Sequence, residues 1–170
     1  WVVSGDREVS VVDFTYNRPR PNDNNAPFKV SEYLNVPYHS TDVIHCGGNY
    51  MTDGLGIAAS SSLVYEENNL ENEEINSLMS SYYGIDTYHV IPDPNDTYID
   101  HIDCWGKYLS PTKVIIREVP ISHPQYDEIE EVANYFSESF TSWGDNWNVY
   151  RVYTPNDQPY SNSLIINNKI

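Results

Sequence analysis

The chain has 170 residues, of which 39% are apolar and 14% aromatic, including 15 tyrosines. This composition suits a folded domain with a hydrophobic core and excludes a disordered acidic tail, which would be poor in aromatic residues. The net charge of −16 and the isoelectric point near 4.4 repel phosphate backbones and anionic lipid surfaces. No apolar run approaches the roughly 20 residues of a transmembrane helix. We therefore expect no nucleic-acid partner and no membrane insertion.

The N-terminal part is predicted to hold two strands, over residues 1–4 and 9–14, around the turn Gly5-Asp6-Arg7. Residues 17–27 are rich in Pro and Asn, which indicates a loop. A short helix over residues 31–34 and a strand over 42–45 follow.

The rest of the chain predicts a strand-strand-helix-strand unit that recurs. The first unit has strands over residues 47–52 and 57–65, a helix that Asn72 caps and Gly84 ends, and a strand over 88–92. The second has strands over 102–109 and 113–119, a helix over 125–142 before Gly144, and a strand over 147–153. A third unit opens at Tyr160. Such a repeat favours a radial or solenoid array, and an ordinary α/β sandwich is the alternative.

The chain ends and the two cysteines each lead to a prediction. The chain starts at Trp1 and ends inside an apolar run, so we expect residues 1–170 to be a single catalytic-domain fragment, truncated at both ends. Cys46 and Cys104 form no metal-type spacing and are too few for a disulfide framework, although one disulfide remains open.

His101 and Asp103 are the strongest candidates for chemistry. Two residues apart on a predicted strand, they should face the same side, with Cys104 on the other. This alternation argues against Cys104 as a nucleophile activated by His101, and for a buried structural thiol. Taken alone, a His-x-Asp pattern more often marks a histidine satisfied by a neighbouring carboxylate.

The wider segment is more specific. Residues 98–107, Tyr-Ile-Asp-His-Ile-Asp-Cys-Trp-Gly-Lys, resemble the signature around the catalytic His and Asp of bacterial peptidyl-arginine deiminases, in the guanidine-modifying superfamily that also holds agmatine and arginine deiminases. Residues 13–23, 47–54 and 158–165 resemble three further segments of that family, in the same order. The resemblance implies an α/β fold, a five-bladed propeller of ββαβ units, of which this chain would supply about three blades.

The resemblance also implies a mechanism that needs neither metal nor cofactor. A Cys thiolate attacks the guanidinium carbon while two carboxylates hold the nitrogens, and a His protonates the departing ammonia and then activates water. His101 would be this acid and base, and Asp103 one of the two clamping carboxylates.

An acidic cluster stands in the loop before His101 and contains Asp93, Asp96 and Asp100. Such a cluster could bind a cation, but we interpret it as a solvated turn.

Four more positions concern the substrate. Arg18 and Arg20 match a pair that binds the α-carboxylate of a C-terminal arginine, which makes peptides or proteins with an accessible C-terminal arginine the expected partners. Tyr98 and Asn162 match positions that line the substrate pocket. Outside the resemblance, the arginines would simply solvate a Pro-rich loop, and Asn162 would pack in a strand.

Two essentials of the family fall outside the sequence: the first clamping Asp before Trp1 and the nucleophilic Cys after Ile170. We therefore expect the parent protein to be active and these residues alone to be inactive. Two alternatives remain open, an agmatine deiminase or other small-guanidine hydrolase, and a non-catalytic arginine-binding propeller. Related peptidyl-arginine enzymes are secreted or attached to the cell surface, which we expect here as well.

Overall fold

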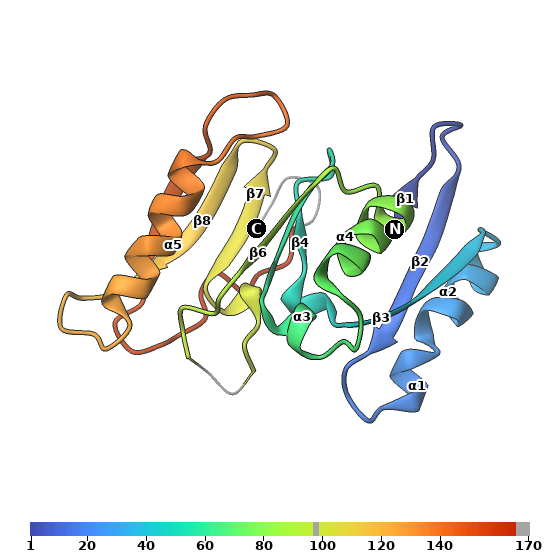
Figure 1. Cartoon of the computed structure of the whole chain (residues 1–170), viewed down its shortest axis with the longest axis horizontal. Helices are drawn as coiled ribbons and strands as arrows, with labels where there is room; N and C mark the ends of the chain where they lie inside the picture. Colours follow the sequence, from blue (N-terminus) through green and yellow to red (C-terminus); the bar gives the residue numbers. More distant parts are fainter. Residues whose placement is uncertain (97–98, 166–170) are drawn as a thin grey trace. The chain divides into compact units, whose positions relative to one another are not determined.

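The computed structural model describes residues 1–96 and 99–165, and in these ranges it is a mixed α/β structure with three-stranded sheets (Figure 1). The sheets contain β1 (Val2–Val3), β2 (Val9–Tyr16) and β3 (Tyr38–His45); β4 (Met51–Thr52), β5 (Ile57–Ser61) and β6 (Thr87–Ile91); and β7 (Gly106–Ser110), β8 (Lys113–Glu118) and β9 (Asn148–Tyr153).

All three sheets have the same topology. The first two strands of each are antiparallel, and the second and third are parallel. Helices lie between the two parallel strands in chain order, as a parallel connection requires. They are α1 (Pro21–Asn24) and α2 (Ala26–Leu34); α3 (Leu63–Glu66) and α4 (Asn72–Tyr83); and α5 (Tyr126–Glu138). The 3₁₀ turns η1 (Gly47–Asn49) and η2 (Ile102–Cys104) precede the second and third sheets.

The ββαβ repeat predicted at Gly47 and His101 is therefore confirmed. It also covers the N-terminal part, to which the sequence analysis assigned no repeat. The strand expected to open another unit at Tyr160 is absent from residues 160–165, which form a turn and irregular structure. None of the three sheets closes on itself within the described residues, and a five-bladed propeller stays a prediction.

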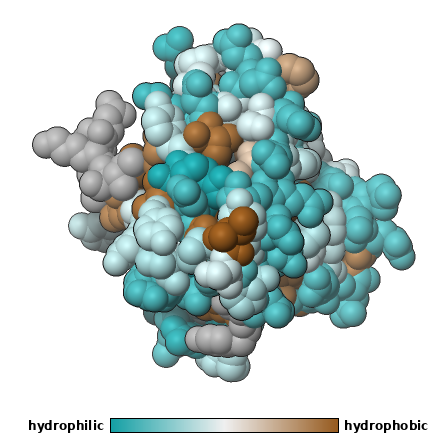
Figure 2. All heavy atoms as spheres, turned by 90° about the vertical axis from the view of Figure 1, so that its left-hand side faces the viewer, coloured by the Kyte–Doolittle hydropathy of each residue, from teal (hydrophilic) through white to brown (hydrophobic). Residues whose placement is uncertain are grey.

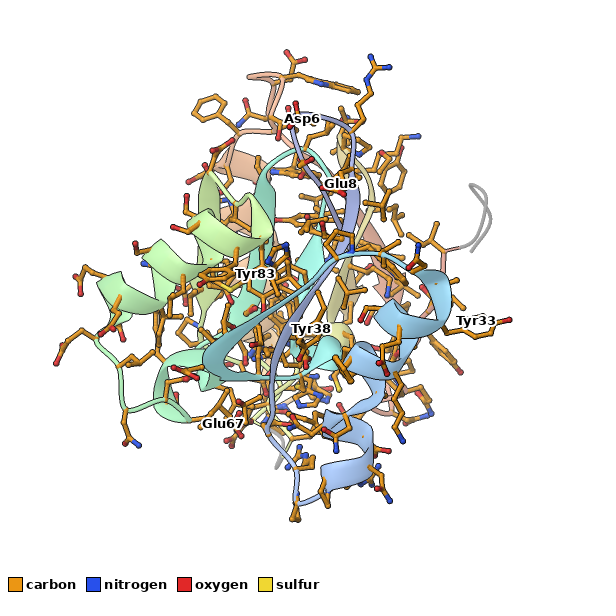
Figure 3. The ribbon with its side chains drawn as sticks, turned by 90° about the vertical axis from the view of Figure 1, so that its right-hand side faces the viewer. Asp6, Glu8, Tyr33, Tyr38, Glu67 and Tyr83 are labelled. Atoms are coloured by element: carbon orange, nitrogen blue, oxygen red, sulfur yellow. The ribbon has the colours of Figure 1, made fainter. Side chains whose placement is uncertain are left out.

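Two compact units divide the described residues. The first unit comprises residues 1–46 and 64–86, and the second comprises residues 47–63 with those from 87 onward. In the first unit, Asp13 on β2 is buried and gathers polar partners. The Tyr38 hydroxyl donates to Asp13 Oδ2 at 2.8 Å, and the Tyr83 hydroxyl lies 3.2 Å from the Asp13 carbonyl oxygen, which it can reach as a donor. Tyr33, 87% exposed, projects outward from this unit instead (Figure 3).

The second unit holds the larger apolar core. It joins residues of both its sheets to one face of α5, which lies along β8 (Figure 1): Met51, Ile57, Ala59, Ile91, Ile102, Trp105, Tyr108, Val114, Ile116, Val132, Ala133, Phe136 and Trp147. The opposite face of α5 carries acidic residues. From the α5 side the surface is mostly hydrophilic, with small separate apolar areas (Figure 2). No helix in the described ranges has the length and apolar content that crossing a bilayer requires.

Several predicted boundaries are wrong. Residues 17–27, predicted as a loop, contain α1 and the start of α2, because Pro21 and Pro27 stand in the first turn of each helix, where the missing N–H costs nothing. The second strand of the first predicted unit ends at Ser61, and α3 begins at Leu63.

Helix ends also differ from prediction. Asn72 is the first residue of α4, and Glu71 stands at the N-cap. Gly84 ends α4 in the left-handed region, as predicted. α5 ends at Glu138, and Gly144, with a φ of +86°, serves a later turn closed by its N–H bond to the Thr141 carbonyl oxygen.

Candidate active site

Asp103 lies in the turn η2 and His101 directly precedes it, so the strand predicted for these two residues is wrong. His101 stands at the N-cap, and the N–H groups of Cys104 and Trp105 bond to the carbonyl oxygens of His101 and Ile102. Ile102 and Trp105 are fully buried, so the core fixes the turn before β7 begins. The alternation argument therefore fails: Cys104 does not face away from Asp103, since its Sγ lies 3.7 Å from Asp103 Oδ1.

Gly48 nevertheless brings His101 and Asp103 to one place. A Cβ at Gly48 would lie 2.7 Å from His101 Nδ1 and 3.0 Å from Asp103 Oδ2. The two side chains thus meet against bare backbone of η1, where no other residue type fits without displacing one of them. The neighbouring Gly47 has nothing within 4 Å of its Cβ position. The predicted imidazole and carboxylate thus lie next to the same point, and His101 is buried there.

Asn49 ties this arrangement to the second sheet. Its side chain is buried, and Oδ1 accepts hydrogen bonds from the N–H of Ser61 at 2.9 Å and of Ile102 at 3.2 Å. Ile102 stands between His101 and Asp103. The Ser61 hydroxyl bonds to the Asp100 carbonyl oxygen, directly before His101. The side chains of Asn49 and Ser61 thereby link η2 to the end of β5.

Burial sets the electrostatics of the pair. Burial raises the pKa of the Asp103 carboxyl above its usual value, although the nearby His101 opposes this rise. Burial, together with the Asp103 carboxylate, raises the pKa of the Cys104 thiol to about 11. The Cys104 thiol is consequently protonated at neutral pH, and a protonated thiol is a poor nucleophile. The expectation that Cys104 is not the nucleophile thus has chemical support, although its original geometric reason was wrong.

The segment after β9 approaches Asp103 as well. The hydroxyl of the buried Ser161 donates to the Asp103 carbonyl oxygen at 3.1 Å. Asn162, the next residue, is exposed, and its N–H bonds to the Pro159 carbonyl oxygen. Its role in a substrate pocket stays a prediction. Tyr98, predicted to line the same pocket, lies outside the described residues.

Arg18 and Arg20 belong to the first unit, so their predicted role beside His101 and Asp103 stays a prediction. Their loop is held locally: Asn17 Nδ2 donates to both carboxylate oxygens of Glu67 at 3.1 and 2.9 Å, and the Arg20 N–H donates to the Arg18 carbonyl oxygen at 2.7 Å. Arg20 is exposed and lies 3.6 Å from Asp23. Figure 3 includes Glu67, the residue that anchors this loop.

Sequence reasoning missed two residues of the site. Gly48 lies in residues 47–54, which the resemblance included without assigning this glycine a role, and the two consecutive glycines at 47 and 48 were the available signal. Ser161 carried no signal, because its contact is to the backbone of a residue far along the chain. No three His, Cys, Asp or Glu side chains of the described ranges cluster as metal ligands would.

Solved structures share this fold. The agmatine deiminase of Enterococcus faecalis superposes with a TM-score of 0.78 at 20% identity, over 88% of this chain and 46% of that one. A Porphyromonas gingivalis protein provisionally assigned as an arginine deiminase superposes with a TM-score of 0.82 at 17% identity, over 96% and 56%. The C. jejuni agmatine deiminase gives 0.67 at 16% identity, over 89% and 45%. The present chain thus spans about half the length of these structures.

The chain therefore has the fold of these deiminase structures, and His101 and Asp103 lie at the start of one of its ββαβ repeats. The sequence model of the Porphyromonas-type peptidyl-arginine deiminase family matches residues 2–170. The chain belongs to this family.

Proposed function

We propose that the protein containing this chain hydrolyses the guanidinium group of arginine to citrulline and ammonia, with C-terminal peptidyl arginine as the preferred substrate. The observation that carries the proposal is that His101 Nδ1 and Asp103 Oδ2 face one point beside Gly48, in a chain whose family match covers residues 2–170. The carboxylate of Asp103 can bind a cationic guanidinium group, and the imidazole of His101 can donate the proton with which the ammonia leaves.

Asp103 acts as a clamp for the guanidinium nitrogens. A carboxylate can accept two parallel N–H bonds from a guanidinium group, which fixes its orientation as well as its position. Burial raises the pKa of Asp103, so the ionised form is costly in the empty site. The cationic substrate offsets this cost when it binds, because a nearby positive charge favours the carboxylate.

His101 transfers protons in both halves of the reaction. A Cys thiolate attacks the guanidinium carbon, the C–N bond breaks, and ammonia leaves with a proton from His101. His101 then takes a proton from water, whose oxygen attacks the thiouronium carbon; the C–S bond breaks and citrulline is released. The net change consumes one water and releases one ammonia.

We propose that the nucleophilic thiol is supplied from sequence beyond these 170 residues. Cys46 does not match the nucleophile's position and is buried, and the pKa of about 11 argues against Cys104. Citrulline release should therefore require the full-length protein. Turnover by residues 1–170 alone that a Cys104→Ser change abolishes would contradict this and make Cys104 the nucleophile.

Arg18 and Arg20 select the substrate in this proposal, because two guanidinium groups suit the α-carboxylate of a C-terminal arginine. Agmatine has no carboxylate, which makes it the discriminating competitor. In the full-length protein we expect the Arg18→Ala, Arg20→Ala double change to raise KM for a peptide ending in arginine by at least about tenfold, roughly one lost charge-assisted bond. KM for agmatine should not change.

The comparison of the two substrates separates the alternatives. A wild-type preference for agmatine that the double change leaves intact would make the protein an agmatine deiminase. Absence of turnover on both substrates, with binding of arginine retained, would indicate a non-catalytic arginine-binding protein.

A further inference from the structure

Arg117, on β8, carries a guanidinium group that is buried away from solvent, with 3% of the side chain exposed. Its partners come from two separate segments. Nη1 donates to Asn95 Oδ1 at 2.6 Å, and Nη2 donates to Asp157 Oδ1 at 2.7 Å and to the Thr154 carbonyl oxygen at 3.3 Å. Nε donates to Thr154 Oγ1 at 3.0 Å. A buried cation with this many fixed acceptors holds those acceptors in fixed positions.

Both segments lead to the candidate active site. Asn95, itself buried, lies between β6 and His101. Thr154 and Asp157 lie between β9 and Ser161, whose hydroxyl donates to the Asp103 carbonyl oxygen. The guanidinium group of Arg117 therefore bonds to Asn95, which precedes His101 in the chain, and to a second segment whose Ser161 contacts the clamp.

Among the described residues that accept a hydrogen bond from the Arg117 guanidinium group, Asp157 is the charged one. Its carboxyl has a lowered pKa because it accepts a hydrogen bond from Arg117, and His123 Nε2 lies 3.0 Å from the same oxygen. Asp157 also has a positive φ of +60°, in the left-handed region that non-glycine residues rarely adopt. A strained backbone held by a buried cation indicates that the position of this segment is determined by the contact.

We propose that Arg117 is a positioning residue for the deimination reaction, which sets His101 through Asn95 and Asp103 through Asp157 and Ser161. This inference rests on the proposed function. The two arms affect different steps: the Asn95 arm holds the chain that precedes the proton donor, and the Asp157 arm holds the segment whose Ser161 contacts the substrate clamp.

A second arginine provides the matched control. Arg151, on β9, pairs in a bidentate manner with Glu130 on α5, and its Nη2 also donates to the Arg117 carbonyl oxygen at 3.0 Å. This pair joins two regular elements, and within the described residues its hydrogen bonds reach neither of the segments that Arg117 binds. Glu130→Ala therefore removes a comparable ion pair from the same unit.

The experiment measures kcat and KM on a peptide ending in arginine, with the full-length protein and its Asn95→Ala, Asp157→Ala and Glu130→Ala variants. We expect Asn95→Ala to lower kcat by about tenfold or more with KM unchanged, and Asp157→Ala to raise KM by a similar factor, since a misplacement of about 1 Å can cost a hundredfold. Asn95→Asp should restore kcat, because its carboxylate still accepts from Arg117. Glu130→Ala should leave both constants within about twofold.

Amide hydrogen exchange of the same proteins is the second readout. Exchange should become faster over residues 99–104 in Asn95→Ala and over 158–163 in Asp157→Ala, and should stay at the wild-type rate in Glu130→Ala. Equal losses of activity in all three alanine variants, or wild-type kinetics in Asn95→Ala and Asp157→Ala, would overturn the proposal. Should the wild-type protein turn over no guanidine substrate, the proposed function fails, and unchanged exchange would then reject the positioning role on its own.

Discussion

At the scale of single residues, the space beside Gly48 is the feature on which the site depends. A Cβ atom at residue 48 would lie 2.7 Å from His101 Nδ1 and 3.0 Å from Asp103 Oδ2, which is too close unless these side chains move. These neighbours are the ends of side chains, which can move at small cost to the fold. A methyl group there should therefore disturb the site far more than it disturbs stability.

Gly48→Ala is accordingly expected to lower kcat/KM of the full-length protein by at least about a hundredfold while changing its melting temperature little. Gly47→Ala is the matched control, because its Cβ meets nothing within 4 Å and the backbone turn is the same. Steady-state kinetics and thermal denaturation of the two variants provide the check. Equal activity of both would show that the space beside Gly48 has no role in the reaction.

The burial of Asp103 has a consequence for stability. Because burial raises the pKa of its carboxyl in the folded state, the folded protein binds the proton more tightly than the unfolded chain does. The contribution of Asp103 to stability is present at low pH and is lost as pH rises through the raised pKa. At neutral pH the ionised carboxylate therefore destabilises the empty protein.

We expect Asp103→Asn to raise the melting temperature near pH 7 and to abolish activity. The difference from wild type should shrink as the pH falls toward about 3, where the carboxyl is protonated in both states. Melting curves between about pH 3 and pH 7 test whether Asp103→Asn raises or lowers the melting temperature, and Asp6→Asn, at an exposed position, is the control. A variant less stable than wild type near pH 7 would contradict the argument.

At the scale of elements, the short turns η1 and η2 determine the site, and Asn49 joins them. Regular elements were largely predictable: a helix ended by Gly84 and a helix over residues 125–142 were expected, and α4 and α5 lie there. The turns were not, because a run of three residues has no periodicity to detect. The error had a consequence, since the assumed strand alternation placed Cys104 on the side opposite Asp103.

Removing the Asn49 side chain tests this link. Asn49→Ala leaves the N–H groups of Ser61 and Ile102 without their acceptor, and each buried donor left unpaired costs about 1–3 kcal/mol. We expect the free energy of unfolding to fall by about 2–4 kcal/mol in urea titrations. The control is Asn148→Ala, whose bond to the Thr112 carbonyl oxygen is exposed and 3.4 Å long. A decrease in the free energy of unfolding of less than about 1 kcal/mol for Asn49→Ala would contradict this structural role of Asn49.

At the scale of the whole molecule, three sheets of one topology show that the chain is built by repetition. The recurring order of strands and helices predicted this from Gly47 onward. The contact between Ser161 and Asp103 could not be predicted, since it joins residues distant along the chain through a backbone carbonyl. The role of Arg18 and Arg20 depends on the complete protein and remains a proposal.

If His101 is the acid and base of a guanidine hydrolase, its removal must slow citrulline release. Citrulline release from a peptide ending in arginine would be followed with the full-length protein and its His101→Gln and Cys104→Ser variants. We expect His101→Gln to lower kcat by at least about a hundredfold, the range of general acid–base catalysis, and Cys104→Ser to retain activity. Wild-type turnover by His101→Gln, or loss of turnover only in Cys104→Ser, would contradict it.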